Sequence, residues 1–206
     1  MGVTARDDSK DWHLTLEVGS KKWHIGNADA KTFEDAYMKK VCGANGCDGG
    51  SPQSFDYRFE DAGYTSKGKG SITMTGSVDN DKDMMNAILD QVEKALVASA
   101  DCSTVKAKKC LSTYKRNPET PQIAQNCHDI EFQSCQLVNY IQATMYDPSH
   151  SQKAQVTFSA KSDEPKAFSC GATIGLIGGA LTAFSFPAMG HGAAGIANAL
   201  CAATTA

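Results

Sequence analysis

The sequence predicts an α+β fold in which amphipathic helices cover one face of an antiparallel sheet, as an α/β sandwich that encloses a Gly/Ala-rich apolar helix near the C-terminus. Two observations predict this class. The first hundred residues alternate between strand-like and helix-like spacing of apolar side chains, in the order strand, strand, helix, strand, strand, helix. The last forty residues, 167–206, contain no Asp, Glu, Lys or Arg.

The chain begins with a pattern typical of a hairpin. Apolar and polar residues alternate over 14–18, Gly19 and Ser20 supply a two-residue turn, and the alternation resumes over 23–25. Residues 29–42 follow with apolar side chains on one helical face, and we expect a helix there.

The next segments repeat this order. Residues 55–59 and 72–78 alternate and predict a second pair of strands, and 81–100 has the spacing of an amphipathic helix. The acidic run that starts at Asp79 imitates a calcium loop, but Met84 stands where such a loop needs glycine. We therefore expect these acids to cap the helix.

The second half divides less clearly. We expect an N-terminal ββαββα region over 1–104, a basic, proline-containing linker over 105–125, and a C-terminal region over 126–206 that either packs with the first or stands apart. Residues 130–145 are apolar with an ambiguous period, and 156–158 predicts one further strand before the apolar tail.

The chain has eight cysteines spread along its length, without the paired spacing of a zinc site. An even number in a chain of 206 residues predicts four disulfides and an oxidising, extracellular environment. The cysteines are Cys42, Cys47, Cys102, Cys110, Cys127, Cys135, Cys170 and Cys201.

Several classes of function lack support. The net charge of −3 and the absence of a basic stripe interleaved with aromatic residues argue against nucleic-acid binding. No motif for a serine nucleophile, a phosphate-binding loop or a metalloprotease is present. We therefore expect no enzymatic activity, no metal and no cofactor.

Lys115 and Arg116 form the only Lys-Arg dipeptide of the chain, just before Asn117 and Pro118. Secretory processing proteases cut after such pairs when they are accessible, and polar linkers are where chains are most readily nicked. Cutting here would produce two chains, which a disulfide across the break would keep together. An ordinary solvated basic loop is the alternative interpretation.

The apolar tail contains Gly171, Gly175 and Gly179 at intervals of four, which places them on one face of a helix. Such a face allows close packing of another helix or backbone, in membranes especially. We expect a buried helix over 170–186, followed by a second apolar arm over 188–200 that forms a helical hairpin with it. The same helix could alternatively insert into a bilayer in a second state.

The cysteines, the Lys-Arg dipeptide and the Gly171–Gly179 segment together resemble the secreted killer toxins of yeasts and smut fungi, and the small cysteine-rich effectors of filamentous fungi. The resemblance is one of pattern, without an alignable motif. It implies a compact α/β sandwich with a Gly/Ala-rich helix, matured by dibasic cleavage.

Two functions are consistent with this resemblance. The first is a secreted fungal toxin-like protein that acts on target-cell membranes through its glycine-rich helix. The second is a non-enzymatic effector or binding module that engages a host or competitor protein, with the apolar helix serving only as its core. Release of dye from liposomes discriminates between them, because only the first requires leakage.

Overall fold

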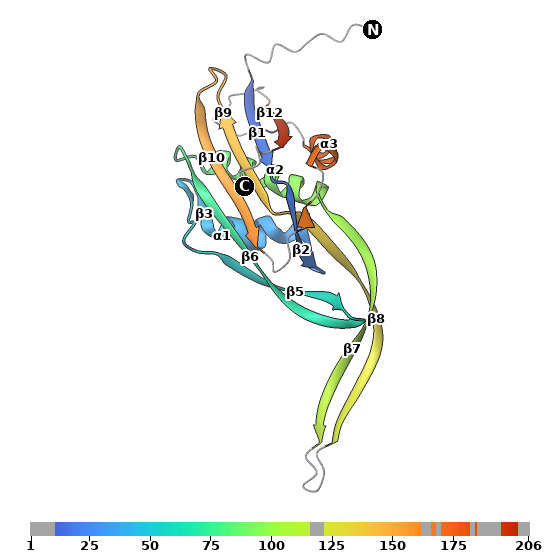
Figure 1. Cartoon of the computed structure of the whole chain (residues 1–206). Helices are drawn as coiled ribbons and strands as arrows, with labels where there is room; N and C mark the ends of the chain where they lie inside the picture. The colour runs from blue at the N-terminus through green and yellow to red at the C-terminus, as the bar shows by residue number, and fades with distance from the viewer. Residues whose placement is uncertain are drawn as a thin grey trace.

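The computed structural model describes residues 11–115, 122–161, 166–167, 170–181, 184 and 195–201. Within this part of the chain, twelve strands form one curled, mixed sheet. Its main path runs β11-β2-β8-β7-β6-β10-β9-β1-β12, with β5 and β4 also paired to β6, and β3 paired to β4 (Figure 1).

The bounds of the elements are as follows. The strands are β1 (Trp12–Val18), β2 (Lys21–Gly26), β3 (Cys42–Gly43), β4 (Gly46–Cys47), β5 (Gln53–Asp61), β6 (Tyr64–Val78), β7 (Asp101–Lys115), β8 (Gln122–Val138), β9 (Tyr140–Tyr146), β10 (Gln152–Lys161), β11 (Lys166–Ala167) and β12 (Gly195–Cys201). The helical segments are the 3-10 turn η2 (Ala30–Thr32), the π-helical η3 (Glu34–Met38), and the α-helices α1 (Lys39–Val41), α2 (Lys82–Ala98) and α3 (Cys170–Ala180).

The predicted fold class is wrong. Strand accounts for 58% of the structure and helix for 24%, and the sheet is a curled mixed one instead of a layer that encloses a long C-terminal helix. The largest difference lies in 105–125, which we expected as a linker. Residues up to Lys115 belong to β7 and those from Gln122 belong to β8. Apart from Ala107, the described side chains of 105–110 are exposed or partly exposed. A strand that buries so little apolar surface lacks the alternation that identifies a half-buried strand.

The predicted hairpin at the start of the chain is also wrong, because β1 and β2 do not pair with each other. β1 pairs with β9 and β12, whereas β2 pairs with β8 and β11. β1 and β2 are thus two halves of one bent strand that runs antiparallel to β9 and β8. The bend lies at Gly19, whose N–H donates to the Tyr140 carbonyl oxygen at 3.0 Å.

The predicted strands over 55–59 and 72–78 are confirmed as β5 and β6. Aromatic residues of β5 lie directly opposite glycines of β6, as Phe55 pairs with Gly70 and Tyr57 with Gly68. The rings cover these glycines so closely that a Cβ added at Gly70 would come within 2.4 Å of the Phe55 ring. The same ring makes an edge contact with Trp23 of β2, with centroids 5.4 Å apart, which links β5 to a strand with which it does not pair.

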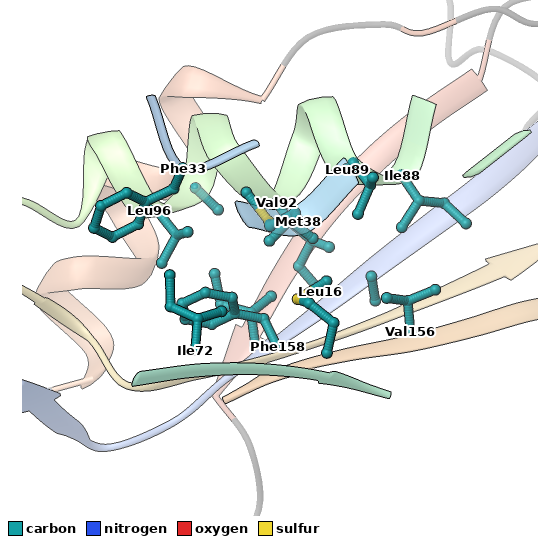
Figure 2. Packing of buried hydrophobic residues seen from close by; sticks show 14 of the residues in the cluster. Leu16, Phe33, Met38, Ile72, Ile88, Leu89, Val92, Leu96, Val156 and Phe158 are labelled. Carbon is teal, nitrogen blue, oxygen red and sulfur yellow. The ribbon is translucent and has the colours of Figure 1, made fainter. Parts of the chain in front are cut away.

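The helix expected over 81–100 is confirmed as α2. The Asp81 side chain caps it by accepting hydrogen bonds from the N–H groups of Asp83 and Met84, both at 2.9 Å, which confirms capping as its role. Figure 2 shows how α2 places Ile88, Leu89, Val92 and Leu96 over the concave side of the sheet. All four of these residues are fully buried. Leu16, Ile72, Val156 and Phe158 meet them from the strands.

The helix expected over 29–42 is broken into η2, η3 and α1, which together present Phe33 and Met38 to the same core. The long C-terminal helix is also shorter than expected, because α3 ends at Ala180. The second arm is not helical where it is described: residues 195–201 form β12, which runs parallel to β1. Strand β10 confirms the prediction over 156–158.

Gly70→Ala should destabilise the fold, because its Cβ has no room beneath the Phe55 ring. Overpacking of this kind costs about 1–3 kcal/mol of the free energy of unfolding. The control is Gly43→Ala, another strand glycine, where nothing lies within 4 Å of the added Cβ. Urea denaturation of the two variants measures the difference, and equal stabilities would contradict the packing described here.

Candidate functional site

The first candidate site is the ribbon formed by β7 and β8, which leaves the body of the protein and extends well beyond it (Figure 1). The two strands pair without interruption from Asp101↔Gln136 to Lys115↔Gln122. At about 3.3 Å per residue, the part beyond Lys108 reaches roughly 23 Å from the last contact with β6. We call the paired segments 109–115 and 122–128 the distal ribbon.

Two disulfides cross the ribbon. Cys102 bonds to Cys135 near its base, and Cys110 bonds to Cys127 at the start of the distal ribbon. Each joins residues directly opposite in the ladder, with Cα atoms 4.1 and 4.0 Å apart. An isolated two-stranded ribbon is only marginally stable in water, so the two disulfides stabilise a strand pairing that hydrogen bonds alone would hold weakly.

The base of the ribbon is tied to α2 and to the β5–β6 turn. The Ser99 hydroxyl accepts from the Val138 N–H at 3.2 Å and donates to the Leu96 carbonyl oxygen at 2.8 Å, inside the core. Further out, the Lys108 N–H donates to the Gly63 carbonyl oxygen at 2.8 Å, and Ala107 is buried beside this contact. The ribbon therefore has a fixed base and a projecting end.

Charge is distributed unevenly along the ribbon. Near the base, Lys106 forms an ion pair with Glu131 at 2.9 Å, and Lys108 lies opposite Asp129 in the ladder. In the distal ribbon the cations lie opposite neutral or weakly basic residues: Lys109 opposite His128, and Lys115 opposite Gln122. Residues 103–128 contain five Lys or Arg and one Glu, in a chain whose net charge is −3.

The predicted processing dipeptide belongs to the far end of this ribbon. Lys115 is the last residue of β7, while Arg116 lies outside the described residues. Both ribbon disulfides join the part of the chain before the dipeptide to the part after it.

A third disulfide joins Cys42 to Cys47. With the two ribbon disulfides, the predicted bonding is confirmed for six cysteines. Cys201 is disulfide-bonded as well, and the side chain of Cys170 lies outside the described part. No cysteine in the described part is free.

The second candidate site is the outward face of α3. The helix buries Ile177 completely and Thr173 nearly so, and it packs against α2 and β12. On the other side Leu176 is 64% exposed. Gly175 and Gly179 are exposed too, with nothing within 4 Å of an added Cβ.

We expected these glycines to pack against another backbone in the folded state, and among the described residues no such contact is present at Gly175 or Gly179. The surroundings of Gly171 lie outside what the structure describes. Glycine in an exposed helix costs about 1 kcal/mol relative to alanine, and no contact within the described chain offsets that cost. The face is smooth, uncharged and open.

Beside the end of α3 lies a shallow groove of about 410 Å³, lined by Lys31, Glu93, Lys94, Val97, Ala98 and Ala180. At its edge the Glu93 carboxylate accepts a hydrogen bond from the Glu34 backbone N–H at 3.3 Å and also interacts with the Glu34 carboxylate. Burial raises the pKa of Glu93, and the neighbouring Glu34 charge adds to the rise, against the lowering effect of that N–H. Lys39 partly balances the pair through its contact with Glu34 at 2.9 Å.

The described residues contain no group of three or more His, Cys, Asp or Glu arranged to hold a metal ion. The imidazoles of His13 and His150 stack with centroids 5.8 Å apart, a pairing that the sequence did not predict because the turn carrying His150 is distant in the chain. In the part of the chain that is described, no helix combines the length and apolar character needed to cross a bilayer.

Comparisons of the chain with protein-family models, with curated proteins and with solved structures give no match. The resemblance to killer toxins and cysteine-rich effectors stays a prediction. A function therefore has to be proposed from the two candidate sites of this chain, the β7–β8 ribbon and the outward face of α3.

Glu93→Gln tests the carboxylate pair. A carboxyl whose pKa is raised by folding binds its proton more tightly in the folded state, so stability rises as pH falls from neutral toward the ordinary value of 4.5. The variant should be more stable than the wild type at pH 7 and should lose part of this pH dependence.

Thermal unfolding from the ordinary pKa of the group, pH 4.5, up to about neutral pH measures how the melting temperature changes with pH. Asp90→Asn is the matched control, on the same helix but paired with Lys94 and away from Glu34. An unchanged slope in Glu93→Gln would contradict the interpretation.

Proposed function

We propose that the protein is a secreted, disulfide-stabilised binding protein without enzymatic activity, which engages a protein on the surface of a host or competitor cell through the β7–β8 ribbon. The observation that carries the proposal is the ribbon itself. Two of the three disulfides between described cysteines hold an element that leaves the core. Of the ribbon side chains beyond Lys108 that the structure describes, those of 109–110 and 126–128, none belongs to the buried cluster that stabilises the body.

Disulfides also support the proposed location, since such bonds persist outside the reducing cytosol. The rigid base agrees with a binding role. Ser99, Ala107 and Lys108 fix the direction of the ribbon, so the distal part is presented to a partner without a large loss of conformational freedom.

A shortened ribbon should fold normally and lose binding to cells. Replacing residues 112–125 by Asn-Gly keeps both disulfides and joins Leu111 to Asn126, which already lie opposite each other. Saturable binding of the fluorescently labelled protein to intact fungal and plant cells is the measurement, with melting temperature and mass as controls. Equal binding by the folded, shortened variant would contradict the proposal.

The Lys-Arg dipeptide suggests that the mature protein has two chains. A cut after Arg116 would fall between the last residue of β7 and the first of β8, and the Cys102–Cys135 and Cys110–Cys127 bonds would keep the products together. The ribbon would remain, with its end opened.

Digestion with a Lys-Arg-specific secretory protease should therefore convert the protein to two chains that separate only after reduction. Mass spectrometry of the native secreted protein with and without reductant checks the same result. Arg116→Ala is the control and should resist the enzyme. A single chain after reduction in both experiments would remove the processing hypothesis.

A second candidate function is action on target-cell membranes, and the outward face of α3 is the observation that favours it. That face exposes Leu176 together with Gly175 and Gly179, and the helix has no charged residue. Small residues at intervals of four permit close association of helices in lipid. Because α3 has 11 residues, it would have to lengthen or lie along the surface to act in this way.

Gly175→Leu separates this candidate from the first. The variant should fold, because the position is open, and should release less dye from liposomes than the wild type if close helix approach matters. Gly178→Leu is a matched control on the same helix, equally open but outside the series of Gly175 and Gly179. Absence of leakage by the wild type at acidic and neutral pH would exclude the membrane mechanism and leave the binding function.

A further inference from the structure

We propose that the outer edge of β7 in the distal ribbon, residues 109–115, binds an extended acidic segment of a partner protein as an added β-strand. The inference rests on the proposed binding function and names the class of partner. Three features of the ribbon support it: an edge without a strand partner, the direction of its backbone groups, and its charge.

The edge is open in the described structure. β8 covers one side of β7 along its whole length, whereas β6 reaches the other side through the single pair Tyr64↔Lys108. Beyond Lys108, none of the described strands pairs with that side. An unpaired edge of this kind is a template for an incoming strand.

The ladder shows which backbone groups face outward. The short Cα separation of 4.0 Å at Cys110 and Cys127 is typical of a non-hydrogen-bonded pair, in which the N–H and C=O groups point away from the partner strand. Lys108 follows the same rule, since its N–H donates outward to Gly63 at 2.8 Å. The next residues of this set are Cys110, Ser112 and Tyr114, whose N–H and C=O groups therefore face the open side.

Charge determines the kind of strand that fits. Within 109–115 the edge carries Lys109 and Lys115 and no acid. Opposite charges across neighbouring strands are favourable and like charges are not. A second copy of β7 would therefore place lysines beside lysines, whereas an acidic strand would pair with them. The outer edge of β8 is less suitable for an acidic strand, because residues 122–128 contain no Lys or Arg and the acids Asp129 and Glu131 follow them.

The test uses a fluorescein-labelled octapeptide of alternating Glu and Val as probe, and the matching Lys-Val peptide as its control. Fluorescence anisotropy should show binding of the acidic peptide alone. Lys109→Glu should weaken it about tenfold, since this substitution puts a negative charge beside the acidic strand in place of a positive one. Lys82→Glu, at the start of α2 and away from the ribbon, should leave binding unchanged.

Ser112→Pro tests strand addition directly. Proline there removes one outward N–H, and proline is tolerated on an edge where that group faces solvent. Because the ladder bonds to β8 come from the neighbouring residues, the ribbon should persist, as checked by melting temperature and intact mass. Ser112→Ala keeps the N–H and is the matched control. Binding should fall at least about fivefold in Ser112→Pro, the loss of roughly one hydrogen bond, and stay constant in Ser112→Ala.

Any of three results with the peptides would overturn the inference: no binding of the acidic peptide by the wild type, equal binding of the Lys-Val peptide, or equal binding of the acidic peptide by the proline and alanine variants. Binding to phosphatidylserine vesicles in place of the peptide would also overturn it, since the ribbon would then recognise lipid. If ribbon-dependent binding to cells persists after any of these outcomes, the strand-addition inference fails while the ribbon's role in cell binding stands.

Discussion

The fold depends on one long antiparallel pairing that bends in the middle. β1 and β2 run along β9 and β8, and the bend is held by the Gly19 N–H bonded to the Tyr140 carbonyl oxygen and by the Asn139 N–H bonded to the Lys21 carbonyl oxygen at 2.9 Å. A side chain at Gly19 would come within 2.9 Å of the Tyr140 Cβ, so the close approach requires glycine. The core lies along both halves of the bent pair, since Leu16 of β1 and Trp23 of β2 belong to one buried cluster with α2. Beyond its pairing with β2, β8 continues into the ribbon with β7, so the projecting element begins where β8 passes β2.

The two candidate surfaces differ in what stabilises them. Among the described side chains of 108–110 and 126–128 none is buried, and two disulfides cross-link the ribbon. The outward face of α3 belongs to a helix whose inner side is well buried, through Ile177 against α2 and β12. The ribbon can therefore be shortened or cut without removing core contacts, whereas changes on the inner side of α3 affect the core. This independence is what makes the two functional hypotheses separable by mutation.

Processing and binding fit together in the ribbon hypothesis. A cut after Arg116 would release the end of the ribbon, while Cys110–Cys127 would still hold the strands in register. The outward backbone groups of β7 precede the cut and would be retained. A charged edge of this kind also protects the free protein from pairing with its own copies, because lysines repel one another across an interface. The same lysines would then favour an acidic partner.

The sequence by itself determined the elements that bury one clear face. It identified α2 from Ile88, Leu89, Val92 and Leu96 with its Asp81 cap, the strands β5, β6 and β10, and the disulfide character of the chain, because periodic burial and capping are local in sequence. Only the tertiary structure decided which strands pair with one another. Gly19 and Ser20 suggested a local hairpin, yet β1 pairs with β9, more than a hundred residues away, since that pairing buries Leu14 and Leu16 under α2. The ribbon gave no apolar pattern because, among its described side chains over 103–110 and 126–134, only Ala107 is buried. The open face of α3 could not be foreseen because helical spacing does not reveal which side of an uncharged helix meets the rest of the protein.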